Sequence, residues 1–261
     1  NARLYAVKPQ TTEEVELLEQ VKKFVHDRFA ETKISVSMLN NFFECTWKWY
    51  FRNFLKLPEV KGVSLALGSA VHNTIEYILK EKSLPADIEI KKFIMQSLQK
   101  EGVNKKSDMS SLGKAAHKAV TTWVEGYYGT LSKDRESERA LSYRDKQFPN
   151  LSMFGKIDLT ERTGSGIVIT DFKTGSSKTA GVIEKLDEEG RLSSYMRQLA
   201  MYAYLVDRTE GNMPDQLRLL FLEEDAKNKN KLYSTHVTGE KIDLLIRDIA
   251  DYQTWLTDGT W

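Results

Sequence analysis

The sequence predicts an α/β fold in which helices pack on a central sheet, with a helical insertion ahead of most of the strands. Residues 153–159 alternate in side-chain character and residues 167–170 are all β-branched, which are the patterns of a half-buried strand and of a fully buried one. On either side of them, apolar residues recur at helical spacing with charges between. Both patterns in one chain are typical of helices packed on a sheet.

Two helices are expected in the N-terminal part. Residues 13–30 place apolar side chains at helical spacing, which predicts an amphipathic helix, and we assign residues 1–34 to this helix and a linker. Residues 35–57 are dense in aromatic side chains and predict a second helix. Ser37 is its expected N-cap, and Pro58 ends it because proline disfavours helical backbone in the residue before it.

Three basic residues, Lys48, Arg52 and Lys56, recur at every fourth position of the second helix, and we call them the basic stripe. Side chains at that spacing share one face of an α-helix, so the stripe could follow the phosphates of DNA. The same pattern is as typical of the solvated face of a helix that packs on a core. The pattern favours neither interpretation.

Another helix is expected from Leu67, where the small residues 68–70 would let it approach the sheet closely. His72 shares a face of this helix with Ile75 and Glu76. A single histidine in such a place is more often a hydrogen-bonded core residue than a ligand.

Residues 88–100 and 111–131 have the apolar spacing of two further helices. We expect them to form an inserted helical lobe over about residues 86–135, ahead of a catalytic sheet over about 140–261. His117 is expected to serve that lobe and not the chemistry.

The rest of the chain predicts strands and two helices. Residues 141–148 are expected to form the first strand, and the strand pair around Gly164 and Gly166 a hairpin. The later elements, in chain order, are a loop over 176–190, a helix over 193–206, strands over 217–222 and 231–237, and a helix over 242–256.

Asp158, Asp171 and Lys173 are the residues that indicate chemistry. Alternate residues of a strand share a face, so Asp171 and Lys173 project to one side, and a hairpin brings Asp158 near them. Two adjacent carboxylates can hold a divalent cation, and Lys173 can hold or activate a water there. An Asp-x-Lys sequence alone is more often a solvated strand end. The helix carrying Gln198 and Tyr202 just after it favours a metal site.

Composition limits the alternatives. The chain has 38 Lys and Arg against 37 Asp and Glu, a net charge of +1, so a nucleic-acid surface must come from local clustering. One cysteine, Cys45, excludes an intrachain disulfide and a multi-thiolate zinc site, and predicts a reducing, cytoplasmic location. No apolar run approaches the ~18 residues of a membrane span, so we expect no membrane partner.

Four motifs in order resemble those of the RecB-type branch of the PD-(D/E)XK nucleases: Gly68-x-x-x-His72, Gly155-x-x-Asp158, Asp171-x-Lys173 and Gln198-x-x-x-Tyr202. The segment from Ser37-x-x-x-Asn41 to Cys45 resembles the nuclease domains of AddB and of UvrD-like helicase-nuclease fusions. The resemblance covers residues 35–261. It implies a restriction-endonuclease-like fold, a mixed sheet with helices on both faces, in agreement with the elements above.

The resemblance implies a metal centre. His72, Asp158 and Asp171 would ligate the metal together with the backbone carbonyl of Phe172. Oxygen-rich ligands favour Mg²⁺ or Mn²⁺, and the single imidazole shifts the balance slightly toward Mn²⁺.

The resemblance also implies roles around the metal. Lys173 would position and polarise the attacking water, while Gln198 and Tyr202 would brace the site or contact DNA. Together with Tyr202, the basic stripe is the expected DNA-binding surface.

Two departures from the family pattern are visible. The expected first strand offers Asp145 and Gln147 where relatives often carry a glutamate, so a ligand from that strand is in doubt. Cys45 resembles the first of four iron-sulfur cysteines found in many relatives, but no other cysteine is present, so we expect no iron-sulfur cluster and an ordinary buried thiol. The three further cysteines were either lost in evolution or removed with the rest of a longer parent, which the missing methionine before Asn1 would fit, and we favour their loss.

The sequence therefore predicts a metal-dependent DNA nuclease domain, acting on single-stranded or unwound DNA. Its expected partner is a helicase domain or subunit, in the same parent chain or apart, in DNA repair or recombination. One alternative is a domain that keeps the fold and binds DNA or scaffolds a complex without cutting. Another is a metal phosphoesterase acting on small substrates. The filled catalytic positions favour the nuclease over the first alternative.

Overall fold

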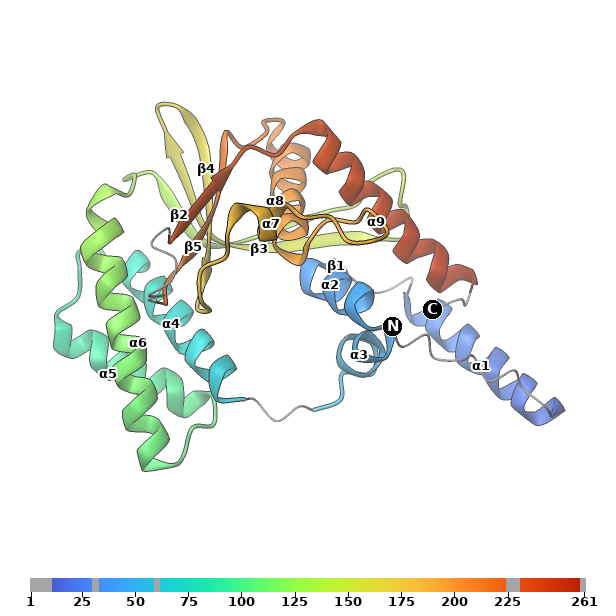
Figure 1. The fold of residues 1–261 in the computed structure, drawn as a ribbon, viewed down its shortest axis with the longest axis horizontal. Helices are drawn as coiled ribbons and strands as arrows, with labels where there is room; N and C mark the ends of the chain where they lie inside the picture. The colour runs from blue at the N-terminus through green and yellow to red at the C-terminus, as the bar shows by residue number, and fades with distance from the viewer. Residues whose placement is uncertain (1–10, 30–32, 59–61, 224–230, 259–261) are drawn as a thin grey trace.

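The computed structural model describes residues 11–29, 33–58, 62–223 and 231–258. A mixed six-stranded sheet lies between two groups of helices, which confirms the predicted fold class (Figure 1). Within the described part of the chain, no helix combines the length and the apolar character needed to cross a bilayer.

One long strand, β3, connects most of the sheet. The strands are β1 (Lys33–Ser35), β2 (Arg135–Tyr143), β3 (Ser152–Thr163), β4 (Gly166–Lys173), β5 (Gln216–Phe221) and β6 (Leu232–Thr235). β3 pairs with β2 along one edge, and along the other with β1 near its start and β4 near its end. β1 is parallel to β3 and β5 parallel to β4, whereas the other pairs are antiparallel. The antiparallel pairing of β3 with β4 confirms the predicted hairpin.

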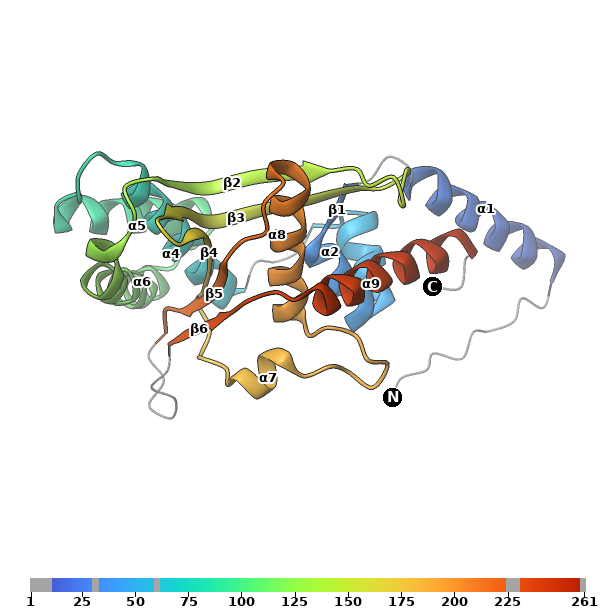
Figure 2. The same cartoon turned by 90° about the horizontal axis from the view of Figure 1, so that it is seen from above.

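Two hydrophobic cores hold the helices on the sheet. The first lies against α2 (Val36–Glu44), α8 (Ser194–Glu210), α9 (Gly239–Asp258) and the end of α1 (Thr12–Phe29) around Val25. The second lies against α4 (Val63–Lys80), α5 (Asp87–Lys100) and α6 (Lys106–Tyr127), and includes Phe172 of β4. Figure 2 shows these last three helices at one end of the molecule and α1 extending from the other. A short helix, α7 (Ala180–Glu184), occupies part of the expected loop.

The single helix expected over residues 35–57 is wrong, because the segment breaks at Cys45. α2 ends there, and a short α3 (Thr46–Trp49) continues into a π-helical turn (Tyr50–Phe54). The hydroxyl of Ser35, not that of Ser37, caps α2 by accepting a hydrogen bond from Met38 N. Cys45 is exposed, so the expectation of a buried thiol is also wrong.

The first strand lies earlier than expected. β2 ends at Tyr143, so Asp145 and Gln147 lie in the turn that follows it. Asp145 accepts hydrogen bonds from Gln147 N, at 2.8 Å, and from the Tyr204 hydroxyl. Its carboxylate therefore stabilises the turn against α8.

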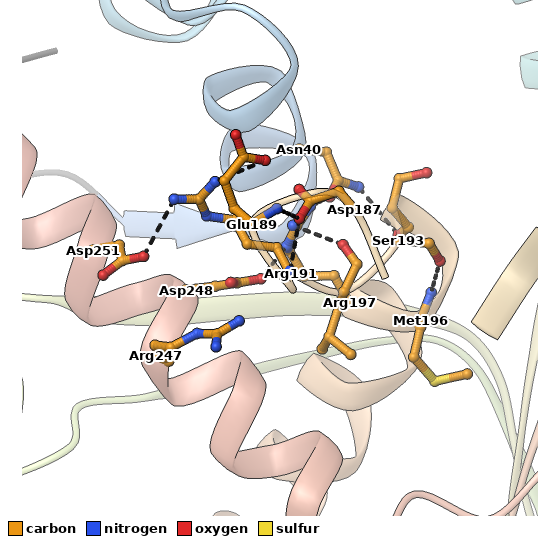
Figure 3. A network of polar contacts seen from close by, with 12 residues as sticks. Asn40, Asp187, Glu189, Arg191, Ser193, Met196, Arg197, Arg247, Asp248 and Asp251 are labelled. Carbon is orange, nitrogen blue, oxygen red and sulfur yellow. Dashed lines mark hydrogen bonds and ion pairs between the residues drawn. The ribbon is translucent and has the colours of Figure 1, made fainter. Parts of the chain in front are cut away.

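A buried polar network fixes the first turns of α8 (Figure 3). Arg197 donates to Asp248 Oδ2 of α9 at 2.8 Å, to Asn40 Oδ1 of α2 at 2.6 Å and to Leu192 O at 2.8 Å. Ser193 caps the helix by accepting from Met196 N. Since the Arg197 and Asp248 side chains are almost fully buried, removing either would leave an uncompensated charge. The network therefore fixes the position of α8 relative to α2 and α9.

Candidate metal centre

Side chains from α4, β2, β3 and β4 lie together near the C-terminal end of β4, which is at Lys173. Three of them, His72 of α4, Glu138 of β2 and Asp158 of β3, place ligand atoms within 4.8 Å of one another. His72 Nδ1 lies 3.5 Å from Asp158 Oδ2. An imidazole and two carboxylates at this spacing form a donor set for a divalent cation.

Asp158 is fixed to the next strand by a backbone hydrogen bond. Its Oδ2 accepts from Phe172 N at 2.7 Å, so β4 holds the carboxylate on the His72 side. The ring of Phe172 also meets the His72 ring edge-on, with 6.2 Å between centroids. The structure thus places the Phe172 backbone, the predicted source of a carbonyl ligand, beside the cluster.

β3 changes faces at Asp158. Ile157 packs in the first core and Leu159 in the second, although residues two apart in a regular strand share a face. Glu138 occupies the position opposite Asp158, between the pairs Ser137↔Leu159 and Arg139↔Ile157, and has φ = 55°. This left-handed backbone is uncommon for a residue other than glycine. The regular alternation predicted over residues 153–159 is therefore wrong between residues 157 and 159. The local twist turns the carboxylates of Glu138 and Asp158 to the same site.

Asp171 lies next to this cluster in a buried position. Its side chain is only 3% exposed, and Oδ2 lies 2.7 Å from Lys173 Nζ. That oxygen accepts no hydrogen bond of ordinary geometry. Its partner is the Lys173 ammonium, and the neighbouring Asp158 carboxylate adds a second negative charge that a divalent cation would balance. The donor set therefore fits a divalent ion.

The charges of the site perturb two pKa values. Burial raises the pKa of Asp171 to about 6, with the Lys173 ammonium lowering it and the Asp158 charge raising it further. Burial lowers the pKa of His72, but its hydrogen bond to Asp158 and the charges of Asp158 and Asp171 outweigh that effect, and the net pKa is raised. The His72 shift reflects the negative charge of Asp158 and Asp171, and the Asp171 shift reflects burial first, so a cation bound here would stabilise a carboxylate that burial disfavours.

Gln198 of α8 connects Lys173 to Asp171. Lys173 Nζ donates to Gln198 Oε1 at 2.5 Å, and Gln198 Nε2 donates to Asp171 Oδ1 at 2.8 Å. The Tyr202 hydroxyl donates to Lys156 O at 2.9 Å and lies 3.3 Å from Asp171 Oδ1. The Lys173 ammonium is thus held beside the Asp171 carboxylate, and the Lys173 side chain is 24% exposed.

Two glycines let the helices carrying these side chains approach the sheet. A Cβ on Gly155 would lie 2.7 Å from Leu205 Cδ1 of α8, closer than packed atoms tolerate. A Cβ on Gly68 would lie 3.0 Å from Thr174 Oγ1, just beyond β4. The first glycine allows α8 to bring Gln198 to Asp171, and the second allows α4 to bring His72 to the strand end.

The expected DNA-binding residues lie in different surroundings. Tyr202 is 5% exposed and its hydroxyl donates to Lys156 O in the interior, which favours the bracing role, and a direct DNA contact by this side chain stays a prediction. In the basic stripe, Lys48 of α3 pairs with Glu44 of α2, with 2.6 Å between their charged groups. Arg52 lies in the π-helical turn, and Lys56 follows that turn with φ = 52°. The three are therefore not one face of a single α-helix.

Glu138 is the site residue that sequence reasoning missed. It forms a close ion pair with Lys156, whose side chain is 53% exposed, and this pairing raises the pKa of Lys156. Its only signal in the sequence is a charged residue in a segment, 135–143, whose alternation is too weak to mark a strand. His117, in contrast, lies 2.5 Å from Asp87 Oδ1 in the helical lobe, away from this cluster.

Comparisons with known proteins agree with this geometry. The family model of the PD-(D/E)XK nuclease superfamily matches residues 33–258. A crystal structure of a candidate exonuclease from Eubacterium rectale superposes with a TM-score of 0.57 at 16% identity, over 96% of this chain and 87% of that one. A second structure, named SSO0001, has a TM-score of 0.36 at 14% identity, over 92% of this chain and 85% of that one, which is too low to support a common fold. No curated protein matches the sequence.

The family match spans most of the chain, from β1 to the end of α9. It includes all four elements that supply the clustered side chains, and the E. rectale structure has a similar arrangement of sheet and helices at a sequence identity that supports the fold alone. The chain therefore belongs to the PD-(D/E)XK nuclease superfamily.

Proposed function

We propose that this chain hydrolyses phosphodiester bonds in DNA with Mg²⁺ or Mn²⁺ as its cofactor. The observation that carries the proposal is the cluster of His72, Glu138 and Asp158, whose ligand atoms lie within 4.8 Å of one another next to the buried Asp171 carboxylate. A site of three carboxylates and one imidazole has too much negative charge to bind a phosphodiester unless a cation neutralises it.

In the proposed mechanism, His72, Glu138, Asp158, Asp171 and the Phe172 carbonyl would hold the metal. A divalent ion held there would supply Lewis-acid chemistry, which makes a water more acidic and stabilises negative charge on phosphoryl oxygens. The chain's own residues then orient the reaction.

Lys173 is the group that positions the attacking water. Its ammonium lies beside Asp171, and Gln198 fixes its direction by accepting one of its protons in a hydrogen bond. A lysine next to a cation has its proton affinity lowered, which helps it to handle the proton of a water. The Tyr202 hydroxyl braces Asp171 and the backbone of β3 through its contacts with Asp171 Oδ1 and Lys156 O.

The basic stripe remains our proposal for a surface that contacts DNA. Support comes from two neighbouring side chains, Trp47 and Phe51, which are 47% and 44% exposed and stack with 5.7 Å between ring centroids. Exposed aromatic rings beside cations are typical of surfaces on which unpaired bases stack. The substrate we propose is therefore single-stranded or unwound DNA.

The cellular setting is also a proposal. The motif order and the aromatic segment support a RecB- or AddB-like nuclease domain that works with a helicase domain or subunit in DNA repair or recombination. Such a domain receives strands already separated, in the cytoplasm. We therefore expect it to cut single-stranded DNA faster than a blunt duplex when no helicase is present.

The test is incubation of end-labelled single- and double-stranded DNA with the protein in Mg²⁺ or Mn²⁺, with and without chelator. Asp171→Asn should abolish cutting, whereas Asp134→Asn, a matched change at a side chain that is 68% exposed, should not. DNA binding without metal-dependent cutting would instead indicate a scaffolding domain. Cleavage of small phosphodiesters but not DNA would indicate a phosphoesterase.

A further inference from the structure

A cavity of about 260 Å³ lies between the helical lobe and the sheet, next to the backbone segments that carry His72 and Lys173. Its walls come from α4, α6 and the ends of β4 and β5. Apolar side chains form most of the lining, and hydroxyl groups supply much of its polar part. The residues that matter here are Leu67, Val71, Ala119, Leu222, Thr122 and Thr174.

The cavity and the metal centre share the same backbone segments. Val71 directly precedes His72 in α4, and Thr174 directly follows Lys173 beyond β4. Consecutive Cα atoms are about 3.8 Å apart, so each wall is one residue from a proposed catalytic or metal-binding group. The cavity therefore adjoins the backbone that positions His72 and Lys173, on the side of the sheet that α4 and α6 cover.

The size and chemistry of the cavity match one flat, mostly apolar group. Pockets for drug-sized molecules begin at about 300 Å³ and are apolar with a few polar groups, so this cavity suits something smaller. The Thr122 and Thr174 hydroxyls can each donate or accept a hydrogen bond, and they can meet the edge of any base. A phosphate fits poorly, because most of the wall is apolar and the two charged lining residues, Lys118 and Glu223, have opposite charges that give no net positive charge.

We propose that this cavity is a base pocket that receives one nucleobase of the DNA strand adjacent to the phosphate at the metal centre. The proposal rests on the nuclease function proposed above and narrows its substrate. A base can enter only if it has left its partner and its stack, so the strand must be unpaired at that position. The two hydroxyls accept several bases, so the pocket selects unpaired DNA and not a sequence.

Filling the pocket tests the proposal. Ala119→Trp places an indole in the cavity, and Ala115→Trp does so from an exposed position on its rim that the fold tolerates more easily. Ser110→Trp is the matched control, because Ser110 is an exposed residue of the same helix that lines a separate cavity facing α5. Circular dichroism and a thermal melt establish that each variant is folded.

The first readout is cleavage of single-stranded oligonucleotides in which one abasic nucleotide is moved along the strand. For the unmodified chain and Ser110→Trp, the abasic nucleotide should lower kcat/KM about tenfold at one position relative to the cut, the loss expected for one buried or stacked base. For Ala119→Trp and Ala115→Trp, the full-base substrate should be cut more slowly, and the dependence on abasic position should vanish. A flat profile in the unmodified chain, or the same profile in all variants, would overturn the base pocket.

A second readout does not require cutting. Asp171→Asn protein is titrated with strands carrying 2-aminopurine, whose emission rises when it leaves the stack. The rise should occur when 2-aminopurine stands at one position of the strand, and it should be absent when the Asp171→Asn protein also carries Ala119→Trp. An equal rise with and without Ala119→Trp, or no DNA binding at all, refutes the base pocket. If the emission behaves as expected but the unmodified chain cuts no DNA with either metal, the base pocket stands and the proposed hydrolysis fails.

Discussion

Replacing Asp171 by Asn should stabilise the fold in the absence of metal. Burial raises the pKa of this carboxyl from its ordinary value of 3.8 to about 6, so the folded chain carries an unfavourable charge at neutral pH. At ~1.4 kcal/mol per pKa unit, the shift corresponds to about 3 kcal/mol. Asn keeps the shape and can still accept from Gln198 Nε2, but it loses the ion pair with Lys173. We therefore expect Asp171→Asn to raise the free energy of unfolding by about 1–3 kcal/mol at pH 7.5.

The pH dependence has a defined sign. Because the folded pKa is raised, the group favours folding fully below pH 3.8, and this contribution is lost as pH rises through about 6. The stability difference between Asp171→Asn and the unmodified chain should therefore shrink toward zero as pH falls from 7 to 4. Metal acts in the opposite direction, since Mg²⁺ or Mn²⁺ at 100 times its dissociation constant should stabilise the unmodified chain by about 2.7 kcal/mol and leave the variant unchanged.

The assay is urea unfolding followed by circular dichroism at several pH values, in chelator and again with metal. Asp134→Asn serves as the control, because its exposed side chain should show little dependence on either pH or metal. If Asp171→Asn were less stable than the unmodified chain in chelator at pH 7.5, or if its stability difference did not change with pH, the assignment of a strained, buried carboxylate would be wrong.

Four other predictions follow from the site and its surroundings. Glu138→Gln should weaken Mn²⁺ binding by at least about tenfold in calorimetry with the fold intact, and unchanged affinity would remove Glu138 from the ligand set. Lys173→Ala should lose turnover but keep metal binding, so a lost calorimetric signal would make this lysine structural. Charge reversal of all three residues of the basic stripe should reduce, by about two, the slope of the logarithm of the binding constant for single-stranded DNA against the logarithm of the salt concentration. An unchanged slope would identify the stripe as a solvated surface. Cys45→Ala should change the free energy of unfolding by less than about 0.5 kcal/mol, because the thiol is exposed, and a larger loss would indicate a packing role.

The parts of the site that could be predicted are those determined by local strand geometry. Alternation along a strand places Asp171 and Lys173 on one side, and a hairpin with a Gly turn brings Asp158 to them. Helical spacing places Gln198 and Tyr202 one turn apart, which is why both reach Asp171. These relations depend on residues within about one turn or one hairpin, so a single sequence contains them.

The parts that failed depend on how distant segments meet. Glu138 reaches the site because its strand lies opposite Asp158 in a particular register, with a left-handed backbone that no local pattern indicates. The buried position of Tyr202 depends on how closely α8 approaches β3 over Gly155. Helical spacing alone could place that side chain on the correct face, but it could not distinguish a brace from a DNA contact.

The sequence by itself determined the α/β class, the hairpin, and the carboxylates and lysine at its end, because periodicity of two or 3.6 residues is a property of the local backbone. Only the tertiary structure decided that the helix after Ser35 breaks at Cys45, that Glu138 joins His72 and Asp158, and that the Asp171 carboxylate is buried beside them. Each of these depends on the packing of segments far apart in the chain. Packing sets which polar groups lose water and which charges come close, and that is what gives the site its affinity for a cation.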